Sequence, residues 1–257
     1  MESIVLRLVL PPLTVLVAGW LQRRVGPRMS GRLVGLPLTS GPLVLVLLLA
    51  EGTPTAVTAA QGVLAGQLMV VGFTTAYALG SSTAARARSV LVASLAIVVL
   101  LGAVAHLAIG RMPWMVGLLV VPLALVALRL WVPSNEQPAM SAGGPSVPQL
   151  LVRAVVTGVL VATLSTSTRL IGAGLSGVLA SVPLVIAVVS PATHRDAGAD
   201  AARAMVRGTL TVVPGTATFA AVLAIALTPL GACAAFVAAG TAMLLVNRAV
   251  GAWDGDR

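Results

Sequence analysis

The chain has 257 residues, of which 58% are hydrophobic and 9% are charged, and its formal net charge is +9. A soluble domain carries about 25% charged residues, so the composition excludes a soluble globular protein and predicts an all-α integral membrane protein. The 16 basic residues are all arginines that lie between apolar runs without interleaved aromatic residues, which argues against nucleic acid as a partner.

A spanning helix needs about 20 mostly apolar residues. Nine segments meet this requirement and are predicted to cross the lipid bilayer: 3–21, 33–50, 57–79, 89–109, 113–132, 150–167, 172–191, 204–227 and 230–248. The first segment has no basic stretch before it and no cleavage site after it, so we expect an uncleaved span in a multi-pass protein of the cell (inner) membrane. The weakest divisions between spans are 110–112 and 228–231.

An internal repeat lies on either side of residues 133–149, a Pro-, Gly- and Ser-rich segment that predicts a cytoplasmic linker. Residues 7–38 align with 153–184, and residues 59–78 align with 201–220, each without a gap. Apolar composition readily produces matches of Leu and Val, but not matches of Arg, Ser-Gly and Pro in register. Such matches include Arg7/Arg153, Ser30/Ser176, Gly31/Gly177 and Pro37/Pro183. We therefore predict a duplication.

The arginines predict the orientation of the spans, because cytoplasmic loops carry an excess of Arg. If the loop after the first span is inside, only Arg7, Arg111 and Arg169 fall outside, which places the N-terminus outside and the C-terminus inside. Five spans precede the second unit, so the second unit is inverted relative to the first. The predicted parts are a first repeat of four helices at 1–112, a linking helix at 113–132, the linker at 133–149 and the second repeat at 150–257.

Two Pro-containing segments occupy equivalent places in the repeats, GRLVGLPLTSGP at 31–42 and GVLASVPLVIAVVSP at 177–191. Proline removes a backbone donor and breaks or kinks a helix, so we expect interruptions at Pro42 and Pro183 near the middle of their spans. Paired interrupted helices mark the substrate site in transporters built from inverted repeats. The predicted substrate-binding residues at the first break are Thr39, Ser40, Gly41 and Pro42. The alternative is an ordinary kink whose hydroxyls bond back to their own helix.

Polar side chains within other spans are further candidates for the substrate site. Gln67, Thr209 and Thr211 are expected to face the protein interior, where they either line a cavity or form interhelical hydrogen bonds. Arg153 and Arg207 lie about one turn inside their spans and either extend to the membrane surface or bind an anionic substrate.

Ionisable groups close to the paired segments are candidates for coupling or gating. Glu51 ends the second span, while His194 and Asp196 follow the seventh. A carboxylate or an imidazole at these places either carries a coupling proton or is an ordinary interfacial charge.

Enzyme signatures are weak. Gly174, Ser176 and Gly177 fit the GxSG pattern of intramembrane proteases, but His106 precedes the serine, which reverses the order of those enzymes. The acidic residues lie in loops, ends or tails, and no phosphate-binding loop or zinc spacing is present. We expect no enzyme, no metal and no cofactor.

The overall plan resembles inverted-repeat secondary transporters in general, on the basis of the repeat and the paired Pro-containing segments. This resemblance implies a small bacterial inner-membrane transporter or exporter with alternating access at a midplane site and a small-molecule substrate. The alternatives are a flippase for a lipid-linked or amphipathic substrate and a non-transporting scaffold subunit. The Gly62-xxx-Gly66 spacing serves either packing within one chain or a homodimer.

Overall fold

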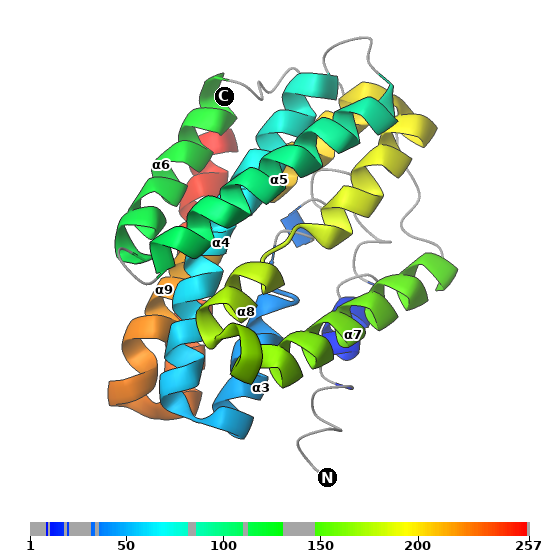
Figure 1. Ribbon diagram of the computed structural model, residues 1–257. Helices are drawn as coiled ribbons and strands as arrows, with labels where there is room; N and C mark the ends of the chain where they lie inside the picture. Colours follow the sequence, from blue (N-terminus) through cyan, green and yellow to red (C-terminus); the bar gives the residue numbers. More distant parts are fainter. Residues whose placement is uncertain are drawn as a thin grey trace.

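The computed structural model describes residues 9, 11–17, 20, 32–33, 36–81, 86–109, 113–130 and 147–255. All regular secondary structure in this part of the chain is helical, which confirms the all-α class (Figure 1). The helices are α3 (Ser40–Glu51), α4 (Thr53–Ser81), α5 (Ala87–Ile109), α6 (Pro113–Leu130), α7 (Val147–Ile171), α8 (Ala173–Ala180) and α9 (Leu184–Gly255). Most of the first predicted span lies outside the described residues.

Four helical stretches are long and apolar enough to cross a membrane: Thr53–Ser81, Ala87–Leu107, Leu150–Ile171 and Ala173–Asp254. The last is 82 residues long, several times the length of a single span of about 20 residues. Large apolar side chains also stand exposed on the outer helices, among them Val99 of α5 and Leu118 of α6. Such exposure is unfavourable in water but suits a surface that faces lipid, so these features support a helical membrane protein.

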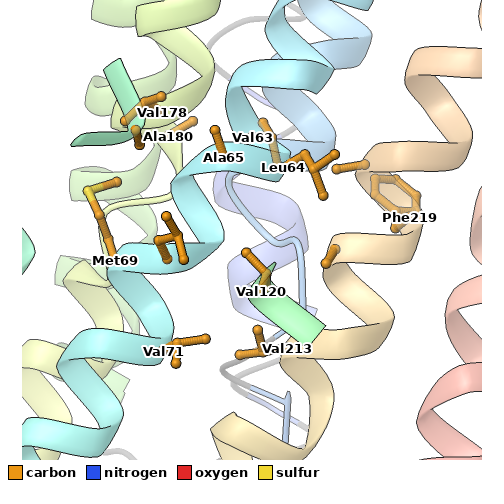
Figure 2. Packing of buried hydrophobic residues seen from close by; sticks show 14 of the residues in the cluster. Val63, Leu64, Ala65, Met69, Val71, Val120, Val178, Ala180, Val213 and Phe219 are labelled. Atoms are coloured by element: carbon orange, nitrogen blue, oxygen red, sulfur yellow. The ribbon is translucent and has the colours of Figure 1, made fainter. Parts of the chain in front are cut away.

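The fourth helix, α4, forms the centre of the fold. Its apolar window is 72% buried, against 22% for the window in α5, and it contacts α3, α5, α6, α8 and α9. Figure 2 shows its side chains Val63, Leu64 and Met69 close to residues of α6, α8 and α9. These aliphatic contacts continue along the buried length of α4, so the core surrounds this one helix.

Small residues bring α4 and α8 into backbone contact. A methyl group built on Gly62 would stand 2.0 Å from the carbonyl oxygen of Gly174, and one on Gly177 would stand 2.1 Å from that of Ala59. Real carbon atoms do not approach an oxygen so closely, so only glycine fits at these two positions. The Gly62-xxx-Gly66 face therefore serves packing within the chain.

The last helix, α9, consists of three helical segments, 184–197, 199–230 and 232–255, separated by Gly198 and Gly231 with non-helical backbone angles. We refer to them as the first, middle and last segments of α9. Gly198 has φ 87° and ψ 174°, and Gly52, 146 positions earlier, joins α3 to α4 with φ 87° and ψ 176°. This left-handed conformation costs little for glycine alone. The same glycine junction therefore recurs 146 positions later, which is the offset that aligns residues 7–38 with 153–184.

Two helix interruptions occur at prolines. One of them is at the proline that the sequence predicted, and the other is at a different proline. Between α8 and α9 the helix stops at Ser181 and resumes after Pro183, as predicted. Before α3 the described residues Leu36 to Thr39 are non-helical and include Pro37, whereas Pro42 lies within α3, so the prediction of a break at Pro42 was wrong. Pro42 lies in the first turn of α3, where a helix does not need the missing N–H group.

Other helix ends lie close to those expected. The α7 helix begins at Val147, inside the predicted linker, because Pro148 is tolerated in a first turn. The two weakest predicted divisions coincide with real ends, since α5 ends at Ile109, α6 begins at Pro113 and Gly231 interrupts α9.

Candidate functional site

The two helix breaks meet at one cavity. Its empty volume, including space open to the outside, is about 610 Å³. Residues of both breaks, α4, α7 and the middle segment of α9 line it: Leu36, Pro37, Leu38, Thr39, Ser40, Gln67, Val70, Thr157, Ala180, Ser181, Val182, Pro183, Leu184, Val185, Ile186, Thr209 and Thr216. The breaks thus come together although more than a hundred residues separate them in the chain.

Five of the predicted substrate-binding residues line this cavity: Thr39, Ser40, Gln67, Pro183 and Thr209. Three others lie in the neighbouring helices without lining it: Gly41, Pro42 and Thr211. Arg153 lies on α7, and its side chain is outside the described part of the structure. The sequence reasoning missed Thr157 and Ser181, although each interrupts an apolar run with a hydroxyl.

The backbone follows the same path through both breaks. Each proline is spanned by a tight turn, in which Leu38 N–H donates to Leu36 O and Leu184 N–H donates to Val182 O, both at 2.7 Å. The next helix begins in the same way, with Gly41 N–H donating to Pro37 O and Ala187 N–H donating to Pro183 O, both at 2.9 Å. These donors and acceptors occupy equivalent positions of the sequence repeat.

The hydroxyls around the cavity fall into two groups. Ser181 Oγ donates to Val63 O at 3.2 Å and fixes the second break against α4. Thr209 donates to Met205 O at 3.3 Å, and Thr211 donates to Gly208 O at 2.7 Å, so these two bond back to their own helix. Neither of these bonds is the interhelical bond that the sequence left open as an alternative, and of the two only Thr209 lines the cavity.

Arg207 lies away from the cavity in a buried ion pair. Its guanidinium binds the carboxylate of Asp254 and donates to Leu128 O at 3.2 Å. The two side chains are 2% and 0% exposed, so the pair is fully removed from the surroundings. Asp254 lies beyond the last predicted span and was expected in a tail, whereas the last segment of α9 extends further and places it in the interior.

A second ion pair joins α7 to α3 at the surface. Arg169, near the end of α7, lies with its Nη2 atom 3.3 Å from a carboxylate oxygen of Glu51 at the end of α3. The Arg169 side chain is 79% exposed, so this contact is weak. Glu51 thus has a defined partner, which the sequence did not indicate.

His194 contacts the hydroxyl of Tyr77, a residue not singled out from the sequence as ionisable. The Tyr77 hydroxyl lies 3.4 Å from His194 Nδ1, and the two rings meet edge to face. His194 is partly buried on the first segment of α9, while Asp196 is exposed. Ser190, one turn before His194, has a buried hydroxyl that binds no other described group.

The positions of these residues connect His194 with the cavity. Ile186, Ser190 and His194 follow one another at intervals of four residues, which places them on one face of the helix. Ile186 lines the cavity, and on α4 the cavity residue Val70 lies seven residues before Tyr77. Both stretches rise roughly 10–12 Å at 1.5 Å per residue, so they run alongside each other from the cavity to the histidine.

The chain matches no protein-family model, and no curated protein or solved structure is significantly similar to it.

Proposed function

We propose that this protein is a bacterial inner-membrane secondary transporter that exposes one central cavity alternately to the two sides of the membrane. The observation that carries the proposal is the cavity itself, which is lined by two proline breaks with the same backbone hydrogen bonds at equivalent repeat positions. A site shared by two related units allows each unit to close one side in turn, as in other transporters with internal repeats.

The proposal includes the arrangement of four helices, one linking helix and four inverted helices, with the N-terminus outside. The order of elements supports it. In the first repeat α3, Gly52, α4 and α5 follow one another, and in the second the first segment of α9, Gly198 and the other two segments follow in the same order. The arginine distribution supports the inversion, because α4 then ends inside and the middle segment of α9 begins inside. The Glu51–Arg169 pair lies on the outer side in this arrangement.

The topology is tested with single cysteines in a Cys233→Ser background, because Cys233 is exposed. Thr53→Cys and Asp200→Cys follow the two equivalent glycine junctions. We expect a membrane-impermeant maleimide to label Thr53→Cys on intact cells and Asp200→Cys only after the membrane is opened. Labelling of both from the same side would contradict the inverted arrangement.

The same background tests the cavity. Val185→Cys lies in the cavity lining and is expected to react with small polar reagents, whereas Leu43→Cys, which is fully buried outside the cavity, is expected to stay inert. If Val185→Cys is as inert as Leu43→Cys, the centre of the protein is closed and the transporter proposal fails.

Gating is assigned to His194 and Tyr77, together with the buried hydroxyl of Ser190 between them and the cavity. His194 and Tyr77 join the first segment of α9 to α4, so their contact holds this side of the cavity closed. Loss of the contact biases the opening of the inner side.

We therefore expect His194→Gln to change the labelling rate of Val185→Cys severalfold, because it weakens the contact that joins the first segment of α9 to α4. Tyr77→Phe, which keeps the ring but removes the hydroxyl, should change the rate in the same direction. Equal labelling rates in the parent chain and in both variants would exclude this contact from gating.

A further inference from the structure

Four backbone amides point to the class of substrate. The residues are Thr39 and Ser40 at the start of α3, and Val185 and Ile186 at the start of α9. All four line the cavity, and none of their N–H groups donates to a backbone acceptor in the described part of the chain. The Thr39 side chain does not cap α3 either. The two pairs occupy equivalent repeat positions, so the same donors are left open in each break.

The carbonyl groups of the same breaks are mostly occupied. Leu36 O and Pro37 O accept backbone hydrogen bonds in the first break, as do Val182 O and Pro183 O in the second. The end of α8, which also reaches the cavity, is satisfied as well, since Ser181 N–H donates to Val178 O at 3.0 Å. The breaks therefore offer the cavity hydrogen-bond donors rather than acceptors, and a donor-rich site suits a ligand with acceptor oxygens.

Two buried hydroxyls lead independently to the same class of ligand. Ser40 is 4% exposed and Thr157 is 3% exposed, and both line the cavity. Neither hydroxyl forms a hydrogen bond with another described residue, unlike the hydroxyls of Thr209 and Ser181. A hydroxyl that opens on a cavity is hydrogen-bonded by water or by a ligand, so Ser40 and Thr157 are placed to donate to a bound ligand or to the water that the ligand displaces.

The charge of the cavity sets the charge of the ligand. None of the lining residues in the described part of the chain is an Arg, Asp, Glu or His. Each helix N-terminus carries roughly half a positive elementary charge, and two such ends amount to roughly one. This charge balances a single negative charge and leaves a dianion half compensated. The remaining walls are aliphatic, including Leu38, Val70 and Leu184, and suit an apolar body.

We infer that the cavity binds a small organic monoanion, with its carboxylate held by the amides of the two breaks and by the hydroxyls of Ser40 and Thr157. This inference rests on the proposed transport function and names the chemical class of its substrate. The apolar part of the molecule lies against the leucine and valine side chains.

The test uses the purified full chain with Cys233→Ser and Val185→Cys, and the probe pair benzoate and benzamide. The two molecules have the same shape but differ in charge. We expect benzoate to slow the labelling of Val185→Cys by at least fivefold at saturation, with benzamide at the same concentration having little effect. The change in thermal unfolding temperature with each probe gives a second, label-free readout.

Two variants assign the binding to the proposed groups. Ser40→Ala removes one hydroxyl and should weaken benzoate binding about tenfold, which is the loss of one hydrogen bond to a charged group. Ile186→Pro removes one open amide and no hydrogen bond within the helix, and should weaken binding similarly. Because Ile186→Pro alters the backbone, the assignment depends on Ser40→Ala. Its matched control is Thr58→Ala, which changes an exposed threonine outside the cavity.

Equal protection by benzoate and benzamide would overturn the anionic class, while the cavity and the transport proposal would stand. The inference also fails if Val185→Cys reacts readily but benzoate, acetate, phosphate and chloride all leave its rate unchanged. Stronger protection by phosphate than by benzoate would overturn the choice of a monovalent carboxylate. An inert Val185→Cys would instead contradict the proposed function, which separates the two failures.

Discussion

Asp254→Asn is expected to destabilise the protein by about 3–5 kcal/mol, because it leaves the buried guanidinium of Arg207 without its counter-charge. Both side chains are almost completely removed from the surroundings, and Arg207 also donates to Leu128 O of α6. The ion pair therefore holds the middle and last segments of α9 together and fixes both to α6. Chemical unfolding of the purified protein in detergent micelles measures the loss.

Asp200→Asn is the matched control for Asp254→Asn. Asp200 forms an ion pair with Arg203 on the surface, where its side chain is 84% exposed, so its loss should cost less than about 1 kcal/mol. Replacing both buried partners, with Arg207→Met and Asp254→Leu, should restore part of the stability because both charges of this ion pair are then removed. Similar small losses for Asp254→Asn and Asp200→Asn would show that the buried pair contributes little.

Gly62→Ala is expected to cost about 1–3 kcal/mol, or to prevent folding, because its new methyl group would overlap the carbonyl oxygen of Gly174. That oxygen belongs to the backbone of α8 and cannot move unless α8 shifts away from α4. The fraction of monodisperse protein in size-exclusion chromatography and the unfolding midpoint report the effect.

Two other glycines provide comparison variants for Gly62→Ala. Gly102→Ala meets only the flexible end of Met69, at 2.9 Å, and should cost less than Gly62→Ala. Gly240→Ala meets no atom within 4 Å and should be neutral or stabilising by up to about 1 kcal/mol, since alanine favours a helix. Equal effects at all three positions would mean that the contact between α4 and α8 is not close.

The amino-acid sequence alone was sufficient to predict the helical class, most helix bounds and the break at Pro183. Each of these is decided locally, by the length of an apolar run or by the backbone restrictions of proline. The sequence repeat also pointed to Thr39, Ser40, Gln67 and Thr209, which line the cavity. Their polarity within apolar spans was a usable signal, because such side chains avoid lipid and face the protein interior.

Tertiary structure decided the partners of the charged and polar groups. Asp254 lies 47 residues from Arg207, Tyr77 lies 117 residues from His194, and Arg169 lies 118 residues from Glu51. No local pattern links such residues. The packing of α4 against α9 brings Tyr77 to His194, the packing of α3 against α7 brings Glu51 to Arg169, and the last segment of α9 brings Asp254 to Arg207. The first break likewise falls at Pro37 and not at Pro42, because a proline in a first turn leaves a helix intact while a proline before it sets where the helix begins. Local chemistry thus determined which segments form helices and where they are interrupted, whereas long-range packing determined which buried groups meet.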